Sequence, residues 1–171
     1  MTSKVCVVGD FAVGKTSVVE RFVTNHFSDK YLSTVGVKID TKEIEFPARG
    51  VAHKLVIWDV AGSDKFGDNE FAYLRGASGY IYVCDGTRST TLQAVEHLQR
   101  QITDKYGPIP SVLLVNKRDL TADWEVSDER FTKIAAGFGA AYRTSAKTGD
   151  DVEQAFIQIA ERIIENDLRG G

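Results

Sequence analysis

One stretch near the start of the chain has the residue types and spacing of a phosphate-binding loop. Residues Gly9–Thr16 read GDFAVGKT, which fits G-x-x-x-x-G-K-[ST], and they join a strand-like run to a segment with helical spacing. In such a loop, backbone N–H groups and the N-terminus of the next helix offer positive charge to phosphate oxygens. We expect Lys15 to bridge the β- and γ-phosphates and the hydroxyl of Thr16 to ligate Mg²⁺. The amides expected to converge on the β-phosphate belong to Ala12, Val13, Gly14, Lys15, Thr16 and Ser17.

A phosphate loop alone does not determine which nucleotide base is bound, so this loop would also fit a kinase or an ATPase. A base-reading element follows the strand-like run Ser111–Val115, and it consists of Asn116, Lys117, Arg118 and Asp119. Ligands in open α/β sheets bind outside the carboxyl ends of strands. The Asp119 carboxylate can accept hydrogen bonds from the ring N–H and the exocyclic amine of guanine, whereas adenine would leave it unsatisfied. A charged loop of this type could also be a solvated turn. Its position after the phosphate loop in the sequence favours a role in binding GTP or GDP.

A second loop follows the last strand-like run and complements the first. Ser145, Ala146 and Lys147 stand at a strand end that points the same way, and their backbone N–H groups suit the carbonyl oxygen of guanine. The aliphatic stems of Lys117 and Lys147 can cover the two faces of the base. Together the two loops disfavour the kinase or ATPase alternative.

The elements that must position these loops predict an α/β fold. Runs rich in Val and Ile alternate with helix-period segments, which indicates a six-stranded, mostly parallel sheet with one antiparallel strand and helices on both faces. The expected strands are Lys4–Val8, Val37–Phe46, His53–Trp58, Gly79–Asp85, Ser111–Asn116 and Ala140–Thr144. The expected helices are Lys15–Thr24, Ser89–Tyr106, Asp128–Gly137 and Asp150–Asn166, with a short one inside Ser63–Arg75. Pro and Gly in Phe46–Gly50 predict a hairpin that makes the second strand antiparallel to the third.

Length and composition exclude several classes of protein. The 171 residues suit one domain spanning 1–171, and 21 Lys and Arg against 24 Asp and Glu give no basic footprint for nucleic acid. Cys6 and Cys84 lie in apolar runs and are expected to be buried thiols. No apolar run reaches the ~18 residues of a membrane span, so we expect a cytoplasmic protein without membrane insertion.

From Val5 to about Asn166 the sequence resembles the Ras superfamily, and within it the Rab branch. Besides the three nucleotide loops, Trp58–Gly62 resembles the D-x-x-G element preceded by the Trp that is typical of Rabs. Tyr31–Gly36 resembles the first Rab switch and Tyr73–Ala77 the tract after the second. The resemblance implies a guanine-nucleotide-binding molecular switch with two loops ordered by the γ-phosphate.

The same resemblance implies roles for residues outside the phosphate loop. Thr34 would ligate Mg²⁺ and contact the γ-phosphate, the Gly62 amide would hold that phosphate, and Asp59 would hold a metal-bound water. Phe27 would stand edge-on against the guanine, although a buried core Phe is an equally good interpretation.

Partner proteins are implied as well. Effectors, an exchange factor and a GTPase-activating protein would bind near Thr34–Ile39, Trp58 and Ser63–Tyr73. In Rabs, three hydrophobic residues at the positions of Ile39, Trp58 and Tyr73 are presented to effectors, with Ile39 here replacing a Phe. Plain core packing is the alternative for Trp58.

Two departures from the family pattern predict slow GTP hydrolysis. Most relatives that hydrolyse GTP well carry a Gln directly after the D-x-x-G glycine, where it orients the attacking water, and this chain has Ser63 there. Phe11 places a bulky ring where relatives have Gly or Ser. The expected catalytic residues are Lys15, Thr34 and Ser63, and catalysis based on a Thr or supplied by a partner remains open. The alternative is a pseudo-GTPase that stays locked in the GTP form and acts as a scaffold.

The family's lipid anchor has no counterpart in this sequence. Rabs carry terminal cysteines for prenylation, whereas no cysteine follows Cys84 here. We therefore expect no lipidation site in this chain. Either the tail is absent from the sequence or the protein works without a lipid.

Overall fold

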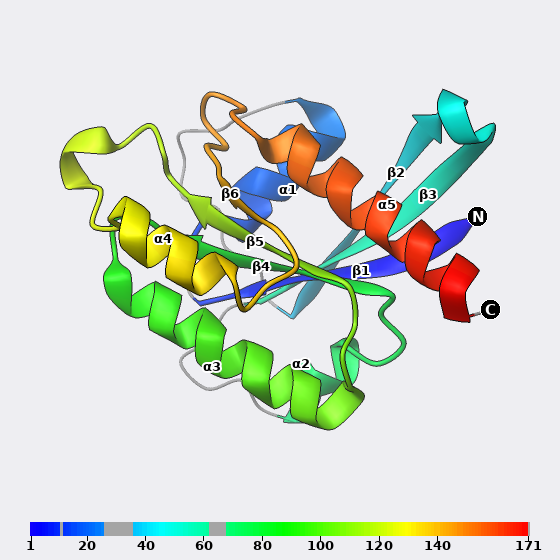
Figure 1. The fold of residues 1–171 in the computed structure, drawn as a ribbon, viewed down its shortest axis with the longest axis horizontal. Coiled ribbons are helices and arrows are strands. Elements are labelled where there is room, and N and C mark those ends of the chain that lie inside the picture. The colour runs from blue at the N-terminus through cyan, green and yellow to red at the C-terminus, as the bar shows by residue number, and fades with distance from the viewer. Residues whose placement is uncertain (11, 26–35, 62–67, 171) are drawn as a thin grey trace.

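The computed structural model describes residues 1–10, 12–25, 36–61 and 68–170 (Figure 1). The strands are β1 (Thr2–Gly9), β2 (Val37–Phe46), β3 (Val51–Val60), β4 (Gly79–Asp85), β5 (Ser111–Asn116) and β6 (Ala141–Arg143). The helices are α1 (Lys15–Thr24), α2 (Asp68–Tyr73), α3 (Ser89–Tyr106), α4 (Asp128–Ala135) and α5 (Val152–Gly170). Two 3₁₀ turns, η1 (Pro47–Arg49) and η2 (Thr121–Asp123), complete the described elements.

The strands form one six-stranded sheet in the order β2-β3-β1-β4-β5-β6. β3, β1, β4, β5 and β6 are parallel to one another, and only β2 runs antiparallel, against β3. The turn between β2 and β3 consists of η1 and ends at Gly50. Gly50 has a φ of 65°, which residues with a side chain rarely adopt. The predicted fold class and the predicted hairpin are both confirmed.

Helices cover both faces of the sheet, so β1 is apolar on both sides (Figure 1). Val5 and Val7 belong to the core under α1 and α5, while Cys6 and Val8 belong to the core under α3 and α4. This two-sided burial explains why the strands of the parallel part read as continuous apolar runs rather than as alternating ones.

β2, β4, β5, α1 and α3 have the predicted bounds, whereas β1, β3, β6 and α4 differ from them by one or two residues and α5 differs at both ends. α5 begins at Val152 rather than at Asp150, because Asp151 has a φ of 56° and so cannot be helical. The helix then runs on to Gly170, beyond the predicted end at Asn166. The short helix expected within Ser63–Arg75 is present as α2.

Both cysteines are free and buried, as predicted. In the described part of the chain, every helix is too short or too polar to cross a membrane.

Candidate functional site

The candidate site lies where the parallel strands end. β1, β4, β5 and β6 are neighbours with the same direction, so the loops that follow them meet at one edge of the sheet. The loop after β1 is the predicted phosphate loop, and the loops after β5 and β6 are the predicted base readers.

Both glycines of the phosphate loop are required by its geometry. A Cβ on Gly9 would lie 2.2 Å from the carbonyl oxygen of Val83 in β4. Gly14 has a φ of 97°, and a Cβ there would lie 2.4 Å from Nδ2 of Asn116. Ala12 also has a positive φ, 58°, which is costly for a residue with a side chain. The loop is therefore a close-packed and partly strained turn.

Side chains of the first base-reading loop hold the phosphate loop in place. Asn116 Nδ2 donates to the carbonyl oxygen of Val13 at 3.1 Å, and Lys117 Nζ donates to that of Ala12 at 3.1 Å. In a trans peptide the carbonyl and the following N–H point in opposite directions. Fixing the carbonyls of residues 12 and 13 on the side of β5 thus turns the N–H groups of Val13 and Gly14 away from these donors.

Lys15 opens α1 and is largely buried, with 7% of its surface exposed. Its Nζ donates to the carbonyl oxygen of Asp10 at 3.1 Å, so the side chain folds back over the loop. Burial lowers the pKa of Lys15 from its ordinary value, while the carboxylates of Asp59 and Asp10 act to raise it. An additional anion would further favour the charged ammonium.

Thr16 and Asp59 meet at the start of α1 and the end of β3. The Thr16 hydroxyl donates to Oδ2 of Asp59 at 2.6 Å, and the Asp59 carboxylate is fully buried. A hydroxyl and a carboxylate are hard oxygen donors, and Mg²⁺ in phosphate sites uses one or two of these together with phosphate and water. The donor set therefore fits the predicted metal.

The two base-reading loops are joined directly. Ser145 Oγ donates to Oδ1 of Asp119 at 2.7 Å, and the backbone N–H of Thr148 donates to Ser145 Oγ at 3.1 Å. Thr144 Oγ1 donates to Oδ1 of Asn116 at 3.1 Å. Asn116 and Ser145 are buried, so both loops are held by internal polar contacts that leave little freedom to their backbones.

Arg21, Asp85 and Arg88 also contact this site and were not predicted from the sequence. Arg21 in α1 donates from Nε to the carbonyl oxygen of Ala146 at 2.8 Å and from Nη2 to that of Lys147. Asp85 ends β4 and is paired with Lys117 and Arg88 at 2.9 and 3.0 Å. A charged residue directly after the apolar run of β4 was the one available signal for Asp85.

Ile39 and Trp58 lie on the neighbouring strands β2 and β3, and Tyr73, at the end of α2, lies close to Trp58. Ile39 is opposite Trp58 in the β2–β3 register and is 50% exposed. The ring centroids of Trp58 and Tyr73 are 6.5 Å apart, and Lys4 Nζ lies 3.7 Å from the centroid of the Trp58 ring. Trp58 is half-buried, so it packs on its neighbours and still reaches the surface.

The other predicted site residues divide into two groups. Ser17 lies in the first turn of α1, and Lys147 is exposed beside the buried Ala146. Phe11, Phe27, Thr34, Gly62 and Ser63 lie outside the described residues.

An α/β sheet with a glycine-rich phosphate loop after its first strand and a carboxylate-bearing loop after its fifth defines a nucleotide-binding domain. The Ras family model matches residues 4–165. The chain is 38% identical to the Ras-related protein Rab-32A of Dictyostelium discoideum, over 97% of this chain and 80% of that protein. It is 35% identical to human Rab-32, over 95% and 75%, and 35% identical to Rab-8A of Pongo abelii, over 94% and 77%. The chain therefore belongs to the Ras family and is a Rab-like small GTPase, which binds GTP and GDP and hydrolyses GTP.

Proposed function

We propose that residues 1–171 act as a single switch domain whose phosphate loop holds the β- and γ-phosphates while the loops after β5 and β6 hold guanine. The observation that carries this proposal is the pair of hydrogen bonds from Asn116 and Lys117 to the carbonyl oxygens of Val13 and Ala12. These bonds join the loop that would bind guanine to the loop that would bind the phosphates. Base recognition and phosphate recognition are thereby coupled.

Each group at the site has a proposed role. Lys15 balances charge between the β- and γ-phosphates, and Thr16 ligates Mg²⁺, with Asp59 orienting a bound water. Mg²⁺, when bound, neutralises part of the negative charge that develops on the phosphates. Asp119 accepts from the guanine edge, while the amides of Ser145, Ala146 and Lys147 donate to its carbonyl oxygen. Phe27, Thr34 and Gly62 take the roles implied by the family resemblance.

A competition titration tests guanine selectivity. Labelled GDP bound to the protein should be displaced by GTP and not by ATP, because adenine leaves the Asp119 carboxylate unsatisfied. The Lys15→Ala variant should lose GDP affinity, which ties binding to the phosphate loop. Displacement by ATP as readily as by GTP would refute the assignment.

We further propose that intrinsic hydrolysis is slow, since the sequence has a serine, shorter than glutamine, at position 63 and a bulky phenylalanine at position 11, where we expect it to crowd the γ-phosphate. Single-turnover decay of bound GTP should be no faster than the Ras range of ~3–5 × 10⁻⁴ s⁻¹. The Ser63→Gln and Phe11→Gly changes should both raise the rate. A wild-type rate at or above ~10⁻³ s⁻¹ would contradict the proposal.

The regulators and effectors that membership of this family implies would bind near Thr34–Ile39, Trp58 and Ser63–Tyr73. The exposed Ile39 beside Trp58 offers an apolar contact of the kind that protein partners bury. The free thiols suit the reducing cytoplasm, where we propose that the switch acts.

The residues Ser63 and Phe11 also favour a second candidate, a scaffold that holds GTP without turning it over. The nucleotide that copurifies with the protein separates the two functions. Bound GDP supports a cycling switch, and intact GTP supports the scaffold.

A further inference from the structure

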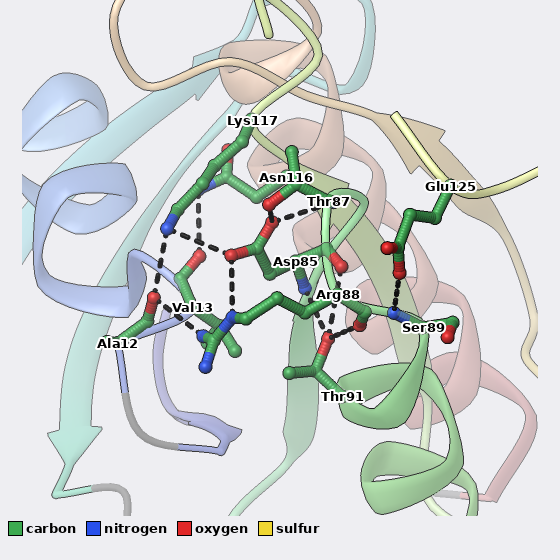
Figure 2. A network of polar contacts seen from close by, with 10 residues as sticks. All are labelled: Ala12, Val13, Asp85, Thr87, Arg88, Ser89, Thr91, Asn116, Lys117 and Glu125. Atoms are coloured by element: carbon green, nitrogen blue, oxygen red, sulfur yellow. Dashed lines mark hydrogen bonds and ion pairs between the residues drawn. The ribbon is translucent and has the colours of Figure 1, made fainter. Parts of the chain in front are cut away.

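The buried carboxylate of Asp85, beside the phosphate loop, accepts hydrogen bonds from the side chains of Thr87, Arg88 and Lys117. Asp85 is 1% exposed, and its Oδ1 accepts from the backbone N–H and the hydroxyl of Thr87 at 2.8 and 2.7 Å. Its Oδ2 lies 3.0 Å from Nε of Arg88 and 2.9 Å from Nζ of Lys117 (Figure 2). Both oxygens of this carboxylate are thus engaged by donors.

The same two cations reach the phosphate loop. Arg88 Nη2 donates to the carbonyl oxygen of Ala12 at 2.9 Å, and Lys117 Nζ donates to the same oxygen at 3.1 Å (Figure 2). Asp85, Arg88 and Lys117 therefore form a bridge between the end of β4 and the tip of the loop. Among the described residues of this loop, Ala12 is the one that has both a side chain and a left-handed φ, so the bridge supports a strained part of the backbone.

The bridge has a direct consequence for phosphate binding. Because the peptide after Ala12 is planar and trans, holding its carbonyl against two cations points the N–H of Val13 the other way. That N–H is one of the donors proposed for the β-phosphate. A loop that is already held in this orientation binds an anion without first ordering its backbone.

Arg88 is suited to this bridge by its chemistry and by its anchoring. A guanidinium can donate from Nε to a carboxylate and from Nη2 to a carbonyl in one rigid plane, whereas an ammonium has a single nitrogen. The backbone around Arg88 is fixed as well, since Thr91 Oγ1 donates to the Arg88 carbonyl at 2.7 Å and the N–H of Ser89 donates to Oε1 of Glu125 at 2.8 Å. The start of α3 thereby offers a firm support for the loop.

We propose that Arg88, held by Asp85, is a positioning residue that keeps the phosphate loop in its anion-binding conformation and slows nucleotide release. This inference rests on the proposed phosphate site. Lys117 remains in the Arg88→Gln variant and keeps one of the two bonds to Ala12, so the loop should loosen rather than collapse.

Release of a fluorescent GDP analogue from the full chain measures the effect. Removing one charge-assisted hydrogen bond predicts roughly tenfold faster release for Arg88→Gln, with an intermediate rate for Arg88→Lys. The matched control is Arg130→Gln, because Arg130 is 41% exposed and Arg88 42%, and Arg130 pairs with Glu96 at 3.1 Å away from the phosphate loop. The control should release GDP at the wild-type rate.

A second readout separates positioning of the loop from general loosening. GMP lacks the β-phosphate, so Arg88→Gln should weaken competition by GDP roughly tenfold and leave competition by GMP unchanged. Equal weakening of both nucleotides, or release within twofold of wild type from both Arg88 variants, would overturn the inference. If the wild-type chain bound GDP and Lys15→Ala abolished binding, such a result would refute the role of Arg88 alone. Failure of the wild-type chain to bind GDP would refute the phosphate site and this inference with it.

Discussion

The hydroxyl of Thr16 lies 2.6 Å from Oδ2 of Asp59, which joins the first turn of α1 to the end of β3. Thr16 is thereby placed beside a fully buried carboxylate at the edge of the phosphate loop. The two side chains present oxygen atoms from two elements that also frame the proposed phosphate site.

This contact predicts that Thr16 controls the dependence of nucleotide binding on magnesium. The Thr16→Ala change removes one hard oxygen ligand, so the Mg²⁺ concentration needed to slow GDP release should rise by roughly tenfold or more. Thr16→Ser keeps the hydroxyl and should behave as wild type. Release rates measured across a Mg²⁺ titration give both values.

The matched control is Thr24→Ala, because Thr24 lies at the other end of α1 and its hydroxyl donates to the carbonyl oxygen of Glu20 at 2.8 Å. It should leave the magnesium dependence unchanged. An unaltered dependence in Thr16→Ala would remove Thr16 from the metal site.

Asp119 is predicted to select the base. In Asp119→Asn the side-chain oxygen can still accept from Ser145, but the amide N–H would oppose the exocyclic amine of guanine. GDP affinity should fall by at least ~10²-fold, and xanthosine diphosphate, which has an oxygen in place of that amine, should bind the variant more tightly than GDP does.

Asp123→Asn serves as the control for this change, since Asp123 is exposed in η2. Both nucleotides should bind it as they bind wild type. A variant at residue 119 that retained full preference for GDP would show that another group reads the base.

The sequence predicted the parts of this site that are contiguous and follow strands, and it missed those that depend on contacts across the chain. The phosphate loop and residues 116–119 are short motifs at predicted strand ends, and the structure places both where parallel strands of the sheet end. Arg88 and Ala12 are 76 residues apart, and Arg21 and Ala146 are 125 apart, so local patterns carry no trace of these contacts. The late start of α5 was missed for a related reason, because periodicity does not reveal a positive φ.

Asp85 is predicted to make stability depend on pH. Burial alone would raise the pKa of Asp85, but hydrogen bonds from Thr87, Lys117 and Arg88 outweigh it and hold the pKa below its ordinary value of 3.8. A carboxyl group with a lowered pKa in the folded state stabilises that state fully above its ordinary pKa. This contribution is lost as pH falls from 3.8 through the lower folded value.

The Asp85→Asn variant should therefore be less stable than wild type by roughly 2 kcal/mol at pH 7, and the difference should shrink below about pH 3.8. Urea unfolding at matched GDP and Mg²⁺ concentrations gives the free energies. Glu96→Gln is the control, because its pair with Arg130 is exposed and should contribute little at either pH. A pH-independent difference would show that ionisation of Asp85 is not its source.

The two thiols are predicted to report opening of the nucleotide-bound fold. Cys6 and Cys84 have no exposed surface, and burial raises the pKa of both thiols, that of Cys6 to about 12. Only a thiolate in contact with solvent reacts with Ellman's reagent, so labelling requires the sheet to open. Because GDP binds the closed state, raising its free concentration to 100 times its Kd should slow labelling by about 10²-fold. In urea, where the chain is unfolded, both thiols should react rapidly. Labelling of the folded chain at a rate independent of GDP would show that the strands carrying the thiols open without releasing nucleotide.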